Sequence, residues 1–225
     1  MEQAYDKPLP KPRGSRLVDL IVRFALHPKR LGYRILGRAG ITCFLAGLVT
    51  PSEIDRRCFE NPGSFDVRFL SEAEIQAVAG RQGNLFVPEF AQRALAKGDR
   101  CHGVLDSGEL VSFTWYSAGA TELVDGLIAD FHPDYVYGYK SFTHPGYRGR
   151  RLHALSLAHA LRRFASEGLK GVLGFVEAEN YSSVRSGLRA GGSILGRVWI
   201  ISLGSRTWLL HTAGCRRAGL RLSRP

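Results

Sequence analysis

The spacing of apolar residues changes between period two and period 3.6 along most of the chain, which is typical of alternating strands and helices. Ser71 and Glu74 form a capping box, the signature of a helix start, directly after the alternating stretch SFDVRFL. The predicted elements are strand 64–70, helices 72–80 and 89–97, hairpin 101–117, strand 135–143, helix 150–165, strand 171–177, helix 182–190, and strands 193–203 and 206–212. This order predicts an α/β fold with helices packed against one sheet.

The first 60 residues follow a different pattern. Residues 1–14 are basic and rich in proline, so we expect a tail without helix. From Ser15, five apolar residues follow helical spacing, namely Leu17, Val18, Leu20, Ile21 and Phe24. The run AGITCFLAGLVTPS at 39–52 has no charges but is shorter than the roughly 20 residues of a membrane span. We predict a helical extension over 15–60 that packs on the domain, with peripheral membrane contact through 15–50 as the alternative.

These patterns divide the chain into four parts: the tail 1–14, the helical extension 15–60, an α/β domain over 61–214, and a basic C-terminal tail over 215–225. The N-terminus does not resemble a signal peptide, because its apolar stretch starts late and contains Asp19 and Arg23. The four cysteines form neither a CxxC pair nor a pattern of disulfides. We therefore expect reduced thiols and a cytoplasmic protein.

The formal net charge of +11 indicates an acidic partner, which could be a phosphate-bearing ligand, a membrane surface or nucleic acid. Aromatic residues do not alternate with the basic ones as in a groove for single strands, which argues against nucleic acid. No histidine has a second metal-binding neighbour at usable spacing, so we expect no metal.

The stretch HPGYRGRRLH at 144–153 places three arginines around Gly149 at the start of a predicted helix. Cations are unfavourable at a helix N-terminus, whereas anions bind there through free backbone N–H groups. The stretch therefore predicts an anion site, with a solvated basic turn as the alternative.

Two motifs resemble the GCN5-related N-acetyltransferases, the GNAT superfamily. Thr143-His144-Pro145 followed by Arg148-Gly149-Arg150-Arg151-Leu152 is similar to the family's V-x-P and R-G-x-G-[IL] segments. Asn180-Tyr181-Ser182-Ser183, after the next strand, is similar to its Asn-x-x-[AS] motif. The resemblance covers residues 64–212 and implies a central mixed sheet flanked by helices, to which the helical extension is added.

The resemblance also implies the roles of individual residues. Phe142 and Thr143 would bind the pantetheine arm of coenzyme A through their backbone, Asn180 would contact the same arm, and Ser183 would lie near it or near a phosphate. The pyrophosphate would be held by the backbone amides of Arg148, Gly149, Arg150, Arg151, Leu152 and His153. Acetyl-CoA or another acyl-CoA would be the co-substrate.

The chain departs from the family pattern at two positions. Arg151 stands where glycine or alanine is usual, and Gly187 stands where many members have the tyrosine that protonates the departing thiolate. We consider Tyr181 or a water molecule as the acid. Glu177, at the end of its strand, is the candidate base, whereas we interpret Glu179 as a charge that favours the start of the helix.

The resemblance implies transfer of an acetyl group from acetyl-CoA to a primary amine on a small molecule or peptide. The loops at 80–90 and 121–134 would contact the acceptor. One alternative is a long-chain N-acyltransferase supplied by acyl-CoA or by acyl carrier protein. Another is a binding module that keeps the fold without catalysis, an interpretation that Gly187 favours.

Overall fold

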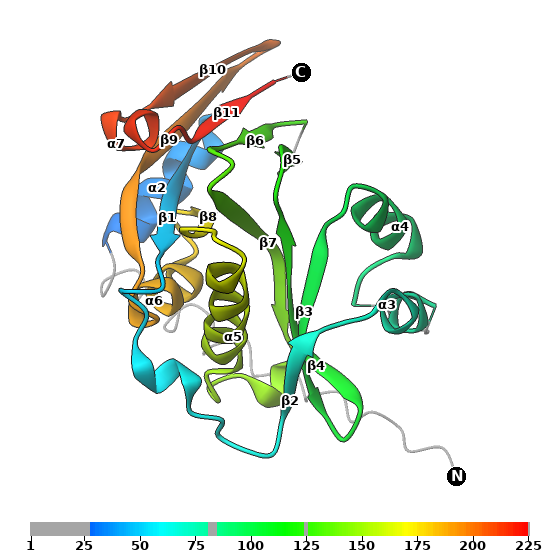
Figure 1. The fold of residues 1–225 in the computed structure, drawn as a ribbon. Helices are drawn as coiled ribbons and strands as arrows, with labels where there is room; N and C mark the ends of the chain where they lie inside the picture. Colours follow the sequence, from blue (N-terminus) through cyan, green and yellow to red (C-terminus); the bar gives the residue numbers. More distant parts are fainter. Residues whose placement is uncertain (1–27, 81–84, 124–125, 225) are drawn as a thin grey trace, which may run out of the picture.

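The computed structural model describes residues 28–80, 85–123 and 126–224. Figure 1 shows helices on both faces of a large twisted sheet. The predicted tail at 1–14 and the apolar stripe from Leu17 to Phe24 lie outside the described residues, so the predictions made for them stay predictions.

The elements predicted between residues 64 and 212 are present, each with ends within two residues of the prediction. In chain order the structure contains α2 (Pro28–Arg38), β1 (Ile41–Val49), the short 3-10 helix η1 (Arg56–Phe59), β2 (Asp66–Phe69), α3 (Glu72–Ala79), α4 (Pro88–Ala96), β3 (Arg100–Asp106), β4 (Glu109–Ser117), β5 (Thr121–Glu122), β6 (Ile128–Asp130), β7 (Tyr135–Thr143), η2 (Pro145–Tyr147), α5 (Leu152–Ser166), β8 (Gly171–Glu177), α6 (Tyr181–Arg189), β9 (Ser193–Leu203), β10 (Arg206–His211), α7 (Ala213–Arg217) and β11 (Arg221–Ser223). The sequence analysis did not predict the short strands β5 and β6.

The main sheet has eight strands in the order β10-β9-β1-β8-β7-β4-β3-β2. Strands β7 and β8 are parallel, and the other neighbouring pairs of this sheet are antiparallel. The predicted α/β fold with a mixed sheet is confirmed.

The helical interpretation of 39–52 is wrong, because Ile41–Val49 form β1 inside the sheet. β1 pairs with β8 on one edge and with β9 on the other. Ala46 has no exposed surface and Cys43 is 4% exposed. A strand covered on both faces reads as a continuous apolar run, which periodicity cannot distinguish from a short buried helix. The sheet thus includes a strand that precedes the expected domain start at residue 61.

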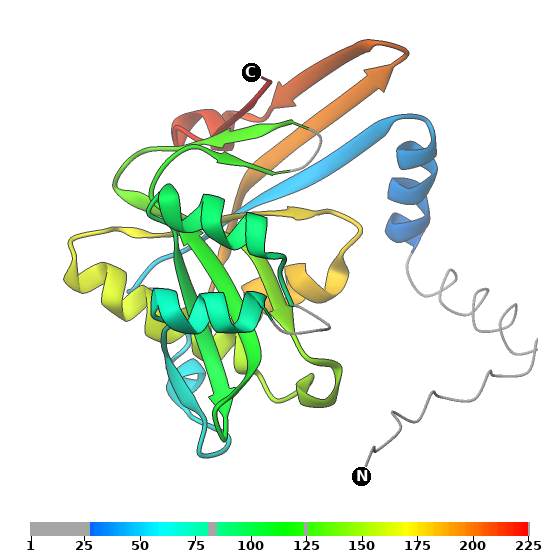
Figure 2. The ribbon, with the colours of Figure 1, turned by 90° about the vertical axis from the view of Figure 1, so that its right-hand side faces the viewer.

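Helices cover the two faces of the sheet in separate groups. α5 packs on one face, where Phe164 and Leu161 are buried against strand residues such as Tyr116. α3 and α4 pack on the other face over Trp115 and Phe113, and we call this the α3–α4 face. Figure 2 shows both helices in front of the sheet.

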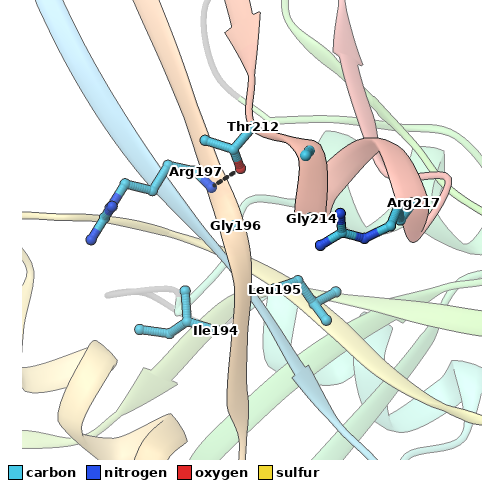
Figure 3. A pocket seen from close by; sticks show the side chains of 8 residues that line it. Ile194, Leu195, Gly196, Arg197, Thr212, Gly214 and Arg217 are labelled. Atoms are coloured by element: carbon cyan, nitrogen blue, oxygen red, sulfur yellow. Dashed lines mark hydrogen bonds between the residues drawn. The ribbon is translucent and has the colours of Figure 1, made fainter.

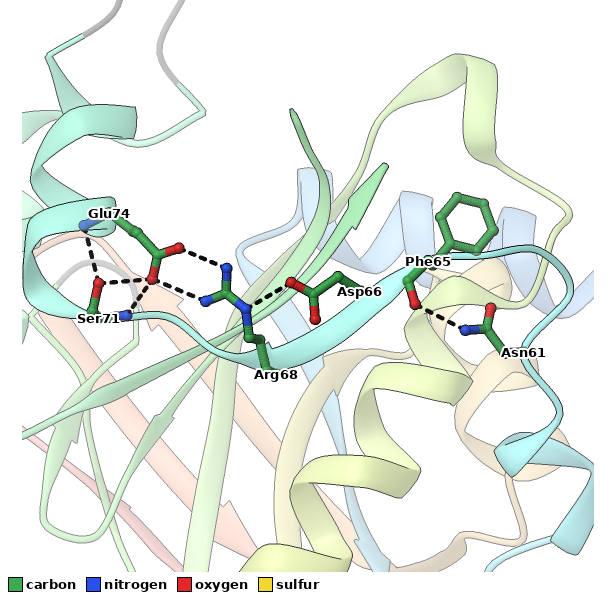
Figure 4. A network of polar contacts seen from close by, with 6 residues as sticks. All are labelled: Asn61, Phe65, Asp66, Arg68, Ser71 and Glu74. Atoms are coloured by element: carbon green, nitrogen blue, oxygen red, sulfur yellow. Dashed lines mark hydrogen bonds and ion pairs between the residues drawn. The ribbon is translucent and has the colours of Figure 1, made fainter. Parts of the chain in front are cut away.

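A charged network joins β2 to the start of α3 (Figure 4). Arg68 contacts Asp66 at 2.7 Å and Glu74 at 2.7 Å. The Glu74 carboxylate also accepts the backbone N–H of Ser71, which completes the predicted capping box. Hydrogen bonds from Arg68 and then Ser71 hold the pKa of Glu74 at about 2.

The predicted C-terminal tail is packed. Cys215 on α7 and Leu222 on β11 are buried in one cluster with Val198 of the main sheet. β11 pairs with β6 in a second, three-stranded sheet with β5. Within the described ranges, we find no helix with the length and apolarity that crossing a membrane requires.

Candidate functional site

Strands β7 and β8 run parallel but pair over only part of their length. Three residue pairs join them, the last being Tyr137 with Leu173, whereas β7 continues to Thr143 and β8 to Glu177. Past that pair, no further residue pairs join the two strands, so the facing N–H and C=O groups need other partners, and the backbone of Phe175 has one in the Tyr137 side chain. We call these unpaired edges, 138–143 and 174–177, the strand opening.

A β-bulge in β7 lies beside the strand opening. The β4–β7 register shifts between the pair Trp115–Tyr139 and the pair Phe113–Phe142, so β7 holds one extra residue there. Lys140, in this stretch, has a φ of 46°, which is uncommon for a residue with a side chain. Because a bulge bends its strand and increases the local twist, it gives a physical reason why β7 leaves β8.

Side chains fix the turn that follows β7. The Tyr147 hydroxyl donates to the Asp106 carboxylate at 2.8 Å, and the Arg150 guanidinium lies 5.1 Å from the centre of the Tyr147 ring. Arg148 Nε donates to the carbonyl of Thr143 at 3.2 Å. Two of the three arginines, Arg148 and Arg150, are therefore held against the turn. The same contacts fix the turn at the end of β7.

The turn presents backbone amides at the N-terminus of α5. No side chain caps this helix, and its first backbone hydrogen bond runs from Leu155 N–H to Arg151 O. The N–H groups of Leu152, His153 and Ala154 therefore lack acceptors within the helix. Gly149 at φ 85° and Arg151 at φ 61° are left-handed, a geometry in which neighbouring N–H groups converge on an anion.

The start of α5 lies next to α6. His153 Nδ1 is 3.4 Å from the Ser186 hydroxyl, and burial lowers the pKa of His153. Asn180 caps α6, because its side-chain oxygen accepts the N–H of Ser183 at 3.2 Å and the hydroxyl of Ser182 at 2.9 Å. The structure thus brings both sequence motifs to one region, with the Asn180 oxygen engaged in the cap.

Glu177 and Tyr181 lie on the β8 side of the strand opening. Glu177 is exposed at the end of β8, opposite Phe44 of β1. Tyr181 is half-buried at the start of α6 and lies close enough to Tyr33 of α2 to contribute to its raised pKa, which burial mainly causes. At Gly187, a side chain would begin in open space.

Three polar residues that the sequence analysis missed meet on the α3–α4 face of β7. The Tyr139 hydroxyl donates to the Asp99 carboxylate, which also lies 3.1 Å from Lys97 Nζ. Asp99 follows the left-handed Gly98 at the end of α4, and its side chain is 1% exposed. The sequence carries no local signal for this contact, because Asp99 and Tyr139 belong to distant segments that only the sheet brings together.

A hollow of about 410 Å³ lies between β9 and α7 (Figure 3). Gly196 and Gly214 line it, and a side chain at Gly214 would begin 1.7 Å from the carbonyl of Leu195. Figure 3 shows the Arg197 side chain on one side of β9 and the Arg217 side chain on the other, beside α7. The hollow follows from the close approach of two backbones and does not involve the motifs around the strand opening.

The described part of the chain contains no group of side chains with the residue types and positions of a metal site. Across residues 28–80, 85–123 and 126–224, no three His, Cys, Asp or Glu side chains are grouped so that they could hold a metal ion.

Comparison with known proteins gives similarity at the level of the fold. No family model and no curated protein matches the chain. A GCN5-related N-acetyltransferase from Sphaerobacter thermophilus is 15% identical over 85% of the chain, with a TM-score of 0.49. A GCN5-related N-acetyltransferase-like protein from Streptococcus suis is 14% identical over 76%, with a TM-score of 0.48, and a GCN5-related N-acetyltransferase from Kribbella flavida is 17% identical over 84%, with a TM-score of 0.43.

The matched regions leave part of those proteins uncovered. The chain spans 56%, 65% and 66% of the three structures in the same order, less than two thirds of each.

Proposed function

We propose that the chain is an acyltransferase that moves an acetyl group from acetyl-CoA to a primary amine. The observation that carries the proposal is the position of the strand opening, which lies directly before the turn of free amides and arginines. A thioester needs hydrogen-bond donors at its carbonyl, and the diphosphate of coenzyme A needs an anion site. The free edge of β7 would supply the donors for the thioester carbonyl. The start of α5 would supply the anion site for the diphosphate.

The anion site consists of the backbone amides from Arg148 to His153 in this proposal. Left-handed Gly149 brings the backbone close to the pyrophosphate without a side chain in between. Arg148 and Arg150 add positive charge next to the amides. Arg151, whose guanidinium lies 4.0 Å from the buried Cys58 sulfur, adds a cation where the family has a small residue.

The pantetheine arm would lie in the strand opening, along Phe142 and Thr143 on one side. Asn180 and Ser183 would contact it from the start of α6. The amine attacks the thioester carbonyl, the N–C bond forms and the C–S bond breaks, and the sulfur leaves as a thiolate. Glu177 and Tyr181, the predicted base and acid, would act from the β8 side.

Calorimetric titration with coenzyme A tests the proposal. Gly149→Glu should weaken binding by about tenfold or more, because it places a carboxylate at the anion site. Gly168→Glu is the matched control, since Gly168 is also left-handed, with a φ of 87°, has equally open surroundings and lies at the far end of α5. Equal affinities in the two variants, or no binding by the natural protein, would refute the proposal.

A further inference from the structure

The hairpin of β9 and β10 forms one edge of the main sheet and carries apolar side chains on both of its faces. β10 is the last strand in the sheet order, so within this sheet it pairs with β9 alone. One face of the hairpin packs inward, where Val198, Ile200 and Leu209 belong to the apolar clusters around β1 and β8. Because side chains alternate along a strand, the residues between these three point to the opposite face.

That opposite face presents large apolar side chains to solvent. Leu203 is 59% exposed, Leu210 is 55% exposed and Trp208 is 44% exposed. Trp208 lies across from Ile201 and Leu210 lies across from Trp199, and Leu203 continues the alternation of Ile201 on β9, so all of them share one face. We call Leu203, Trp208 and Leu210 the hairpin patch. Isolated exposed apolar residues are ordinary, whereas a group on two paired strands marks a contact surface.

Helix α2 lies beside the hairpin patch. The Tyr33 ring of α2 is 6.1 Å from the ring of Trp199, and Ile35 on the same helix is 56% exposed. The N–H of Ser202 donates to the carbonyl of Gly40 at 2.7 Å, which joins the hairpin to the residues just after α2. In Figures 1 and 2 the turn of the hairpin projects beyond the rest of the sheet. The patch is therefore accessible to an extended surface.

The surroundings of the patch are cationic. Residues 180–224 contain eight arginines and no acidic residue, and residues 28–52 contain no acidic residue either. These stretches form α2, β1 and the elements from α6 to β11, around the β10 edge of the sheet. Arg206 is exposed and faces Leu203 across the hairpin. Among the described residues, the arginines in ion pairs all lie in other segments: Arg57, Arg68, Arg100 and Arg163. The charge around the patch is thus available to an anionic partner.

We propose that the hairpin patch and the arginines around it dock the protein on the surface of a bilayer that contains anionic lipids. Tryptophan favours the boundary between headgroups and acyl chains, and leucine gains free energy by entering the apolar layer. Arginine is attracted to anionic headgroups. None of the three patch residues belongs to the proposed coenzyme A site, so the inference goes beyond the proposed function and does not rest on it.

A bilayer explains the patch better than two other partners. Nucleic acid would also attract the arginines, but Leu203 and Leu210 have no polar atom for its phosphates or base edges. A second copy of the chain would bring two surfaces without acidic residues together, and like charges repel. The contact also differs from the one considered for residues 15–50, because β1 lies inside the sheet.

Co-sedimentation of the full chain with vesicles tests the inference. The vesicles contain phosphatidylcholine alone or with about 30% phosphatidylglycerol. One variant combines Trp208→Ser with Leu210→Ser, and another is Arg206→Glu. The matched controls lie on α4, at the other end of the sheet: Val87→Ser changes a residue that is 54% exposed, and Arg93→Glu makes the same change of charge. The thermal midpoint of each variant is measured to confirm folding.

We expect the natural protein to bind the anionic vesicles about tenfold or more tightly than the neutral ones, and NaCl should weaken that binding. The double variant should lose about tenfold or more in vesicle affinity, because it removes the inserted apolar surface. Arg206→Glu should lose about fivefold or more. The two controls on α4 should bind as the natural protein does.

A second measurement uses the tryptophans and a substitution that keeps the patch apolar. Brominated lipids quench the fluorescence of a tryptophan that contacts the acyl chains. Trp208→Phe should bind the vesicles but lose most of the quenching, because Trp115 is fully buried and Trp199 is half-buried beside α2.

The inference is overturned if neutral and anionic vesicles bind equally, if the double variant binds as the natural protein does, or if Trp208→Phe keeps the full quenching. Loss of binding in Ile21→Asp, with full binding in the double variant, would assign the contact to the N-terminal stripe and would also overturn it. Binding to duplex DNA without binding to vesicles would identify a nucleic-acid site instead. A dimer that the double variant dissociates, again without vesicle binding, would identify an interface between two copies; either result refutes the bilayer contact.

Discussion

Gly191 is the residue at which the chain before η1 crosses the end of α6. Its φ is 94°, and a side chain there would begin 2.0 Å from the carbonyl oxygen of Glu53. Close by, the N–H of Asp55 donates to the carbonyl of Ala190 at 3.0 Å. Only glycine satisfies both the backbone conformation and the contact.

Gly191→Ala should therefore lower the free energy of unfolding by about 2 kcal/mol or more, measured by urea titration. Gly168→Ala is the matched control: its φ is also positive but its surroundings are open, so only the conformational cost of about 1 kcal/mol applies. Equal losses at the two positions would contradict the steric argument.

The capping carboxylate of Glu74 predicts a dependence of stability on pH. Its pKa is about 2 in the folded chain, against 4.5 for an ordinary glutamate. Its contribution is complete above the higher value and disappears as the pH falls toward the lower one, because the unfolded chain then binds a proton that the folded chain does not.

Glu74→Gln should cost less than about 1 kcal/mol at pH 7, because the ion pair with Arg68 is partly exposed. The difference from the natural protein should be constant between pH 7 and about 5 and should shrink toward pH 2, as measured by urea midpoints. A difference that does not change with pH would show that the carboxylate charge has no part in it.

Residues that interact locally could be predicted from the sequence, whereas distant ones could not. Ser71 and Glu74 are three positions apart, so their capping box is visible in the chain itself. The same holds for the basic turn around Gly149, because its glycine and arginines are consecutive in the chain. Asp99 and Tyr139 meet only because α4, β3, β4 and β7 fold together, and no spacing rule connects them.

At the scale of elements, β1 shows where pattern analysis fails. Its sequence ITCFLAGLV has apolar residues at most positions, since neighbouring strands and covering elements hide both faces. Amphipathic elements such as α4 and β2 retain a polar side, and their type was predicted correctly. Burial on one side is therefore what made most of this fold predictable.

A chain that starts at Asn61 should not fold, because it lacks β1. The facing edges of β8 and β9 would lose their shared neighbour, and buried residues of the core such as Ala46 and Phe44 would be missing. Circular dichroism and urea titration should show loss of a cooperative transition.

A chain that starts at Pro28 keeps every described element and should unfold cooperatively, which makes it the control for the truncation. Cooperative unfolding of the Asn61 chain would show that residues 61–224 form a sheet without β1.

At the scale of the whole molecule, the net charge of +11 adds to the charge of the proposed anion site. Charges near a binding site attract an anionic ligand, and salt screens that attraction. Coenzyme A affinity should therefore fall several-fold when NaCl is raised from about 0.02 to about 0.3 M.

Dephospho-coenzyme A has fewer phosphate charges and provides the matched ligand for this measurement. Calorimetric titration should give it a shallower dependence on salt. An identical salt dependence for the two ligands would mean that the additional phosphate of coenzyme A does not interact with the positive charge of the protein.

The place of β1 in the sheet also determines when the fold can be completed. β1 is synthesised before its two neighbours in the sheet, β8 and β9, which begin at Gly171 and Ser193. Pairing between such distant segments closes a long loop, which is typical of slow folding. Until then an apolar strand with two open edges is exposed to other chains. We therefore expect the refolding yield to fall as the protein concentration rises, because unpaired β1 can associate with other chains. During synthesis, β1 is the segment that a chaperone would shield.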